Sequence, residues 1–338
     1  MKACVVYGTR PEMVKLSVLS QTYDVDTICV DQQPDLSEFY SNLMPDPTHR
    51  LSLVKGDLNE RFADCISKIS RSLKGYDAVL VQGDTMTAAA AALSAFQSGI
   101  KVGHIEAGLR TNDISSPFPE EGYRSIISRI STWNFCPTEL SAQNLEKENC
   151  HGSIFVTGNT VIDLVKEMSK DKPITFDNEI VLTLHRRENI IHLPRILSSI
   201  RKIADRDDGL KWTMPVHPNP YVKEIVLKEL RGSNISLVDS IEYPSFIEKL
   251  RTCRLIVTDS GGIQEEAAFF KKRVVVCRES TERPEGISAG FASIGFDDPG
   301  RSILEALDSP PWDGSNPYGN GTSSKIIADL LKIPNRGV

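Results

Sequence analysis

The sequence lacks paired cysteines and long apolar runs. Its seven cysteines are scattered and no two form a CxxC pair. A dispersed, odd set is typical of reduced thiols in a cytoplasm and offers no ligand set for structural zinc. No stretch approaches the ~18 apolar residues of a membrane span, and the opening MKACVVYGTRPE contains no apolar export segment. We therefore expect a cytoplasmic protein without a membrane or metal partner.

The chain also lacks an excess of positive charge. Its 39 Lys+Arg face 45 Asp+Glu, which gives a formal net charge of -6. Because nucleic-acid backbones attract basic surfaces, we expect no nucleic-acid partner. The 40% hydrophobic and 25% charged content is that of a globular protein. A length of 338 residues exceeds one ordinary core and predicts about two domains.

Short apolar runs alternate with helical ones along the chain. The runs that we predict as strands cover residues 3–7, 27–30, 77–81, 102–105, 154–156, 180–184, 213–216, 235–238, 255–257 and 274–277. Strand–helix repetition predicts an α/β fold, with parallel sheets covered by helices on both faces.

A charged, aperiodic segment over 165–178 predicts a domain boundary. We expect one Rossmann-like domain over 1–168 and a second over 169–320. The amphipathic end, 321–338, is expected to pack back on the first domain. Polar clusters follow most of the predicted strands, and ligands bind at that edge of an open α/β sheet. We therefore expect two doubly wound domains facing a central polar cleft.

The stretch TDSGGIQEEA, residues 258–267, follows an apolar strand and opens a helix. Free backbone N–H groups and the helix dipole favour an anion there, and Ser260, Gly261 and Gly262 would let a phosphate approach closely. The alternative is an ordinary turn in which Ser260 caps the helix.

Other polar residues after predicted strands are also open to two interpretations. Asp84 is either a helix N-cap or a site carboxylate, and Glu106 is either in a loop salt bridge or in the site. Glu120 and Glu121 follow two prolines and are equally suited to a helix start. His185 and Arg10 are either solvated loop residues or contacts to a phosphate.

Ten short motifs, in order along nearly the whole chain, resemble the UDP-N-acetylglucosamine 2-epimerases, and the non-hydrolysing branch in particular. They are GTRPE at 8–12, GDT at 83–85, HIEAGLRT at 104–111, PFPEE at 117–121, TGNTVID at 157–163, HRREN at 185–189, VHPNP at 216–220, TDSGGIQEEA at 258–267, TERPEG at 281–286 and NPYGNG at 316–321. The resemblance implies the glycosyltransferase-B architecture, a homodimer, a role in polysaccharide biosynthesis and no cofactor. It also implies interconversion of UDP-GlcNAc and UDP-ManNAc by elimination and re-addition of UDP.

The resemblance assigns roles residue by residue. The residues that match catalytic positions are Asp84, Glu106, Glu120 and His185. Those that match UDP or substrate contacts are Arg10, Arg186, His217, Ser260, Gly261, Gly262, Glu266 and Arg283, and for His217 and Arg283 a structural role is an open alternative. Glu265 is expected to face a neighbouring helix or loop.

Three segments depart from the family pattern. Residues 31–34 read DQQP and lack the family's histidine, which puts regulation by a second UDP-GlcNAc in doubt. Tyr123 and Ser128 stand where the family has Asn and Asp. The stretch SAGFASIGFDD, which follows TERPEGI, lacks the family's asparagine-leucine-valine-glycine signature.

Several rival functions stay open. A hydrolysing epimerase would release free ManNAc, and an epimerase for a related UDP-acetamido sugar would share every motif. A glycosyltransferase of the same architecture would need only one base. An inactive binding protein for nucleotide sugars would need none of the carboxylates.

Overall fold

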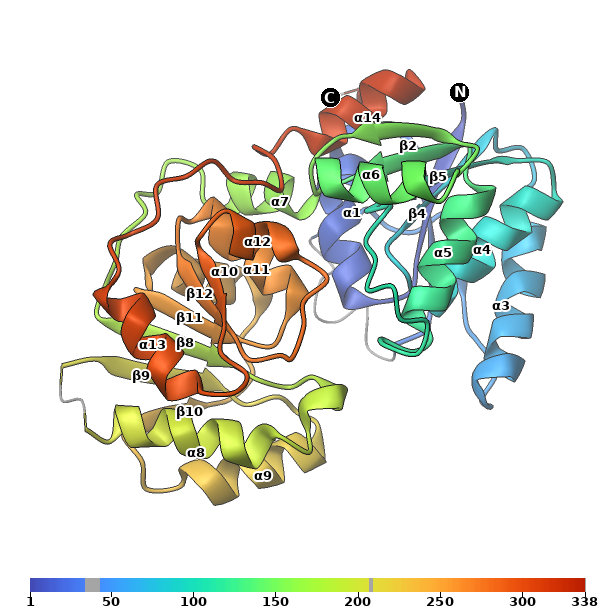
Figure 1. Cartoon of the computed structure of the whole chain (residues 1–338). Coiled ribbons are helices and arrows are strands. Elements are labelled where there is room, and N and C mark those ends of the chain that lie inside the picture. The colour runs from blue at the N-terminus through green and yellow to red at the C-terminus, as the bar shows by residue number, and fades with distance from the viewer. Residues whose placement is uncertain (34–42, 207–208, 338) are drawn as a thin grey trace. The chain divides into compact units, whose positions relative to one another are not determined.

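The computed structural model describes residues 1–33, 43–206 and 209–337 (Figure 1). The chain divides into two compact units. Unit 1 comprises Met1–Leu164 and Tyr318–Val338, and unit 2 comprises Val165–Pro317. Each unit contains one parallel sheet with helices on both faces, so the predicted α/β fold with Rossmann-like sheets is confirmed.

Unit 1 is built on a seven-stranded sheet in the order β3-β2-β1-β4-β5-β6-β7. Its strands are β1 (Ala3–Tyr7), β2 (Val25–Val30), β3 (His49–Leu51), β4 (Ala78–Gln82), β5 (Lys101–Ile105), β6 (Trp133–Cys136) and β7 (Ser153–Val156). Every neighbouring pair is parallel. The strand order reverses direction between β1 and β4, which is where open α/β sheets bind ligands.

Two apolar layers cover this sheet. The helices of unit 1 are α1 (Arg10–Thr22), α3 (Leu58–Ser72), α4 (Met86–Gln97), α5 (Glu120–Ile130), α6 (Glu139–Lys147), α7 (Val161–Met168), which crosses the unit boundary, and α14 (Ser323–Leu331). Helices α1 and α14 share one core cluster, and α3, α4 and α5 share the other. The alanines of α4 are almost fully buried within unit 1, so this Ala-rich helix belongs to the core.

Unit 2 repeats the pattern on a six-stranded parallel sheet in the order β10-β9-β8-β11-β12-β13. Its strands are β8 (Glu179–Thr183), β9 (Lys211–Pro215), β10 (Ile235–Val238), β11 (Leu255–Thr258), β12 (Arg273–Val276) and β13 (Ala292–Ile294). The order reverses between β8 and β11, so the HRREN and TDSGG motifs both lie at the switch point.

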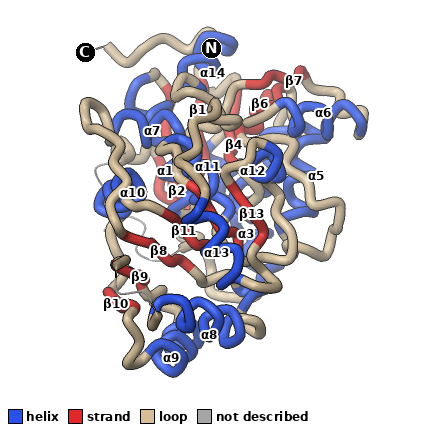
Figure 2. Tube along the Cα trace, turned by 60° about the vertical axis from the view of Figure 1, so that its left-hand side comes forward, coloured by secondary structure: helices blue, strands red, loops and turns tan. Residues whose placement is uncertain are grey.

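The helices of unit 2 are α8 (Leu193–Ala204), α9 (Pro220–Leu230), α10 (Tyr243–Thr252), α11 (Gly261–Phe269), α12 (Pro284–Ser288) and α13 (Pro299–Asp308), with a short 3-10 turn η1 (Arg187–Asn189). Apolar side chains of α8, α9 and α13 pack on one face of the sheet. Both views show α8 and α9 beside β9 and β10 (Figure 1, Figure 2).

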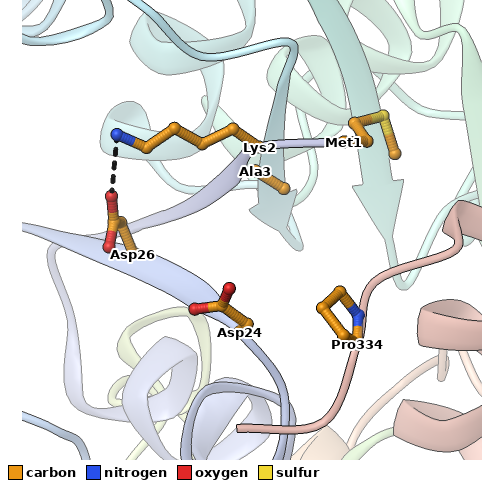
Figure 3. Close-up of a pocket in the computed structure, with 6 residues that line it drawn as sticks. All are labelled: Met1, Lys2, Ala3, Asp24, Asp26 and Pro334. Atoms are coloured by element: carbon orange, nitrogen blue, oxygen red, sulfur yellow. Dashed lines mark ion pairs between the residues drawn. The ribbon is translucent and has the colours of Figure 1, made fainter.

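The C-terminal segment is fastened to unit 1 by hydrogen bonds as well as by packing. Both carboxylate oxygens of Asp163 accept backbone N–H groups at the start of α14, from Ser323 at 2.9 Å and from Ser324 at 2.5 Å. Beyond α14, Asn335 forms an antiparallel bridge with Tyr23. A pocket of about 340 Å³ lies between this segment and the amino ends of β1 and β2, lined by Met1, Lys2, Ala3, Asp24, Asp26 and Pro334 (Figure 3).

Among the described residues, three short strands are not predicted by the sequence, namely β3, β6 and β13. Each has only three or four residues, and β3 and β13 are edge strands. In the described part of the chain, no helix has the length and apolar character needed to cross a membrane.

Candidate active site

Glu106 is a buried carboxylate of unit 1 with donors from three separate elements. It follows β5 directly, is only 8% exposed, and has a left-handed backbone with φ of 66°. Lys15 of α1 donates to Oε1 in a buried salt bridge, and Gln82 at the end of β4 donates to Oε2. Asn159, in the turn after β7, donates to Oε1 at 2.9 Å. A non-glycine residue in this backbone region costs about 1–3 kcal/mol and is typical of functional sites.

Asp84 lies in the turn after β4, the strand next to β5. Arg124 of α5 donates to its Oδ2 from Nε at 3.0 Å and from Nη2. The same guanidinium donates to Glu121 at 3.0 Å. Gly83, which directly precedes Asp84, lies close to Glu106. A methyl group placed on Gly83 would be 3.3 Å from Oε2 of Glu106. The turns after β4 and β5 thus bring Asp84 and Glu106 to one edge of the sheet.

Glu121 organises the loop between β5 and α5. Its Oε1 accepts the backbone N–H groups of Thr111 at 3.0 Å and Asn112 at 3.2 Å. Glu120, one residue earlier, is half-buried at the start of α5 and has no hydrogen-bond or ion-pair partner among the described residues. Because Glu120 and Arg124 are four residues apart on one helix, Glu120 shares the helix face that contacts Asp84.

Two buried ionisable groups support these turns. Glu12 of α1 accepts the backbone N–H of Gly8 at 2.8 Å and the hydroxyls of Thr9 at 2.8 Å and Thr85 at 2.6 Å, and burial raises its pKa to about 7. His104 of β5 contacts the Gly83 carbonyl through Nε2 at 2.8 Å. Burial lowers the pKa of His104 to about 4, so its imidazole is neutral at neutral pH.

Arg10 and the 31–33 segment lie beside the turn after β1. The backbone N–H of Arg10, at the start of α1, donates to Gln33 at 3.0 Å. Gln32 instead serves α4, since its Oε1 accepts the backbone N–H of Thr87 at 3.0 Å and its hydroxyl at 2.6 Å. The DQQP motif therefore has a structural role at Gln32, while its Pro34 lies outside the described residues.

In unit 2, a fully buried carboxylate shapes the turn that holds His185. Asp259, directly after β11, accepts the backbone N–H of His185 at 3.0 and 3.1 Å and that of Arg186 at 2.9 Å. Asn189 donates to the same carboxylate at 3.3 Å and to the Cys277 carbonyl at 2.6 Å. The Asp259 side chain thus holds the HRREN turn against β11.

The His185 ring stacks on His217, with centroids 4.9 Å apart and planes within 2°. His217 accepts the backbone N–H of Asn219 through Nδ1 at 3.1 Å. Burial lowers the pKa of His185, while the Asp259 carboxylate opposes that shift. A neutral His185 can both accept and donate a proton, which suits it to assist a leaving group.

The turn of Ser260, Gly261 and Gly262 opens α11 at the carboxyl end of β11. The Ser260 hydroxyl makes no cap bond to the helix, and a methyl group on Gly262 would meet nothing within 4 Å. Gly261 is covered, because a methyl group there would lie 2.4 Å from a guanidinium nitrogen of Arg283. The helix N-terminus therefore presents open space at Gly262, as expected for a phosphate-binding turn.

Glu266 lies one turn further along α11, on the same helix face as Gly262. It is 5% exposed and accepts the Tyr243 hydroxyl through Oε1 at 2.7 Å. Its neighbour Glu265 is fully buried and accepts from Arg283 at 2.8 Å. The two adjacent carboxylates thus have different partners.

A buried ion cluster surrounds Arg283. Glu282 accepts from Arg283 at 2.7 Å and from Arg278 at 2.6 Å, and Arg186 lies 3.7 Å away. Burial alone would raise the pKa of Glu282, but these three guanidinium groups lower it overall. The cluster fixes the Arg283 head over the glycine turn.

The structure thus groups Asp84, Glu106 and Glu120 around one edge of the unit 1 sheet, with Arg10 at its β1 end. It groups His185, Arg186, His217, Glu266, Arg283 and the glycine turn around the corresponding edge in unit 2. Sequence reasoning missed the partners Lys15, Gln82, Asn159, Asp259 and Glu282. The described residues contain no group of three His, Cys, Asp or Glu side chains placed to hold a metal ion.

Two Rossmann-like units, one with carboxylates at the carboxyl edge of its sheet and one with a glycine-rich turn at a helix N-terminus, are typical of nucleotide-dependent α/β enzymes. The family model for UDP-N-acetylglucosamine 2-epimerase matches residues 20–332. A putative UDP-N-acetylglucosamine 2-epimerase of Thermotoga maritima is 38% identical over 96% of this chain and 95% of its own. The chain belongs to the UDP-N-acetylglucosamine 2-epimerase family.

Solved structures agree with this assignment. The Neisseria meningitidis UDP-GlcNAc 2-epimerase bound to UDP-GlcNAc matches with a TM-score of 0.88 and 34% identity, covering 98% of this chain and all of that one. The S. aureus MnaA structure with UDP matches with a TM-score of 0.89 and 32% identity, covering 98% and 96%. These similarities extend over both units.

Proposed function

We propose that this protein interconverts UDP-GlcNAc and UDP-ManNAc without hydrolysis. In the first step a carboxylate base removes the C2 proton of the sugar. The electron pair forms the C1=C2 double bond of 2-acetamidoglucal, and the C1–O bond breaks with its electrons on the UDP oxygen. In the second step that oxygen re-adds to C1, and an acid delivers a proton to the opposite face of C2.

The carboxylates of unit 1 supply the proton transfers in this proposal. A weakly acidic C2 proton needs a positioned base, and inversion needs an acid on the other face. Glu106 and Asp84 occupy neighbouring turns, each held by cationic side chains, and Glu120 lies one helical turn from Arg124. Their number favours an epimerase over a glycosyltransferase, which needs one base for its acceptor.

Unit 2 holds the nucleotide in this proposal. Ser260, Gly261 and Gly262 present N–H groups to the diphosphate, and the Glu266 carboxylate accepts two ribose hydroxyls. His185 and Arg186 stabilise the negative charge that grows on departing UDP, and Arg10 and Arg283 add positive charge for the diphosphate. His217 supports His185 through the ring stack.

The set of hydrogen bonds that holds the Glu106 carboxylate is the single observation that supports this function most strongly. Its buried carboxylate has donors from α1, β4 and the turn after β7, and the backbone that aims it is left-handed. A binding protein without catalytic function has no use for a carboxylate oriented at such cost.

Proton NMR of UDP-GlcNAc with the protein in deuterated water tests the proposal. We expect UDP-GlcNAc to give UDP-ManNAc that carries deuterium at C2, and UDP-ManNAc to give deuterated UDP-GlcNAc. Neither reaction should release free sugar. Asp84→Asn is expected to abolish C2 exchange while UDP still binds. Release of free ManNAc with UDP would assign the hydrolysing reaction instead. Sugar transfer that depends on an added acceptor would assign a glycosyltransferase.

Tyr123, Ser128 and residues 287–296 differ from the family pattern, and these differences could change which UDP-sugar is the substrate. If UDP-GlcNAc shows no exchange at C2, the same assay with other UDP-acetamido sugars identifies the substrate. Exchange at C2 with only one of these sugars would support the proposed mechanism and identify that sugar as the substrate.

We further propose a cytoplasmic homodimer that serves polysaccharide biosynthesis. The basis is the family resemblance together with the absence of paired cysteines. Light scattering coupled to size-exclusion chromatography distinguishes a dimer from a 37.4 kDa monomer. Loss of a surface polysaccharide after gene disruption, restored by the wild-type gene alone, tests the pathway.

A further inference from the structure

A second pocket lies in unit 2, at the amino edge of its sheet. It has a volume of about 190 Å³ and is lined by Phe176, Arg254, Lys271, Arg273, Ala306, Ser309 and Pro311. Arg254 immediately precedes β11 and Arg273 is the first residue of β12. The Ser260–Gly262 turn lies at the opposite edge, beyond the four residues of β11, a span of roughly 13 Å. The pocket is therefore separate from the proposed nucleotide site.

Three cationic side chains converge on this pocket without a carboxylate partner. Among the residues that the structure describes, none of Arg254, Lys271 and Arg273 forms an ion pair. The unit 1 pocket differs, because Lys2 there pairs with Asp26 at 3.6 Å (Figure 3). The chain has a net charge of -6, yet all three charged residues that line this pocket are cations.

Backbone carbonyls orient the three cationic groups. Arg273 donates to Pro310 at 2.7 Å and to Gly290 at 3.0 Å, and Arg254 donates to Leu307 at 3.1 Å. Lys271 donates to Gly314 and lies over the Trp312 ring at 4.9 Å. These bonds use only a minority of the N–H groups that two guanidiniums and an ammonium offer.

A fourth cation adds to the positive potential. Lys272 is fully buried, donates to the Thr175 carbonyl, and places Nζ 3.8 Å from the ring centre of Phe176. Since Phe176 lines the pocket, this ammonium lies just behind its wall. A purely structural role for the pocket cations, that of fastening the 307–314 loop, explains their bonds to backbone carbonyls. Asp177 offsets part of the charge of Lys272 behind the wall, but the three cations that line the pocket have no ion-pair partner among the described residues.

We propose that this pocket binds a small phosphate-class anion. A volume of about 190 Å³ corresponds to roughly six water molecules at about 30 Å³ each, which suits phosphate or pyrophosphate with some retained water. Planar guanidinium groups match phosphate oxygens in geometry and charge. This inference does not depend on the proposed epimerase reaction.

Isothermal titration of pyrophosphate and phosphate into the full chain, in low-salt buffer with saturating UDP, tests the site. We expect one binding event whose affinity falls at least 10-fold in Arg254→Gln. That variant loses a single carbonyl bond from an exposed side chain, so its unfolding temperature is expected to match the wild type. Lys228→Gln, which removes an exposed charge on α9, is the matched control and is expected to bind normally.

Three results would overturn the proposal. They are no measurable binding, equal affinity in wild type and Arg254→Gln, and acetate binding as tightly as pyrophosphate.

A further comparison of two variants shows at which edge of the sheet the anion binds. Binding that Ser260→Ala removes and Arg254→Gln preserves would place the anion at the glycine turn, and it would do so whether or not the epimerase assay succeeds.

Discussion

The carboxylate of Asp259 accepts the backbone N–H of His185, at 3.1 Å from Oδ1 and 3.0 Å from Oδ2. Asp259 has no exposed surface and receives two further N–H groups, so all of its side-chain hydrogen bonds stabilise the shape of the turn. It is a positioning residue in the proposed reaction, since it orients His185 without needing to touch the substrate.

Asp259→Asn is expected to lower kcat by about 10–100-fold, because hydrogen bonds to charged groups contribute about 1.5–3 kcal/mol each. The carboxylate also opposes the burial that lowers the pKa of His185. Its loss should therefore move that pKa further down, and NMR titration of the His185 ring measures the shift. Asp297→Asn, on an exposed loop, is the control. A kcat loss with an unmoved His185 pKa would indicate general damage to the fold.

Gly262→Ala separates folding from nucleotide binding. The added methyl group meets no atom of the protein within 4 Å, and alanine in the first turn of α11 favours the helix. We expect an unfolding temperature equal to or above that of the wild type, with UDP affinity at least 10-fold weaker because the methyl occupies the path of the diphosphate. Calorimetry measures both.

Gly261→Ala is the comparison for that variant. Its methyl would lie 2.4 Å from Arg283, so it should disturb the buried ion cluster and lower stability as well as affinity. Unchanged UDP affinity in Gly262→Ala would place the diphosphate elsewhere.

Glu106→Gln should cost both activity and stability. The amide keeps one accepting oxygen and places its NH2 group against either Lys15 or Gln82, so one of these two donors loses its acceptor. In both orientations the buried Lys15 ammonium loses its charge partner. Removing one partner of a buried pair costs about 3–5 kcal/mol, and losing a positioned base costs about 10²–10⁴ in rate. Urea unfolding and the NMR exchange assay measure the two effects.

Glu148→Gln is the matched control in unit 1. Its bidentate pair joins the buried Arg110 guanidinium to a partly exposed carboxylate, so Glu148→Gln should also lower stability while epimerisation is unchanged. Full activity in Glu106→Gln would remove Glu106 from the proton-transfer steps.

Apolar runs predicted most of both sheets because parallel strands are buried on two faces and read as continuous hydrophobic stretches. The strands that were missed lack that signal. β3, His49–Leu51, contains a single apolar residue, and β13 has only three residues. β6, Trp133–Cys136, follows α5 after only Ser131 and Thr132 and contains the polar Asn134, so neither a turn signal nor a continuous apolar run marks it as a strand.

The positions of the site residues could be predicted because they follow strands directly, and the carboxyl ends of parallel strands share one edge. Their partners could not. Lys15 looks like an ordinary helical lysine, and Asn159 lies 53 positions from Glu106 in the chain. Asp259 belongs to a motif read for its serine and glycines, yet its carboxylate serves a turn some 74 residues earlier. Such pairings are formed by sheet topology, which no local pattern encodes.

His104 predicts how stability responds to acid. Its Nε2 faces the Gly83 carbonyl, so that nitrogen carries the proton of the neutral ring, and Nδ1 faces the Ser128 hydroxyl at 3.2 Å. Burial lowers its pKa from 6.5 to about 4 in the folded protein. Between these values the unfolded chain holds more protons than the folded one, so the free energy of unfolding falls as the pH drops from 6.5 toward 4.

The full effect of that shift is about 3 kcal/mol. Glu12 acts in the opposite direction, because its raised pKa makes acidification between about pH 7 and 4.5 stabilising. The difference between wild type and His104→Gln, measured by urea unfolding at each pH, cancels the Glu12 contribution. We expect that difference to shrink by about 3 kcal/mol from pH 7 to pH 4. A difference independent of pH would mean that His104 titrates normally.

Ser128→Asp provides the decisive comparison, since the family pattern has Asp at this position. A carboxylate facing Nδ1 at the distance of the present hydroxyl would stabilise the imidazolium and raise the pKa of His104. The loss of stability between pH 6.5 and 4 should then become smaller, because the pKa values of the folded and unfolded states lie closer together. NMR titration of the His104 ring would show the same displacement directly, and an unshifted titration would exclude the contact between residues 104 and 128.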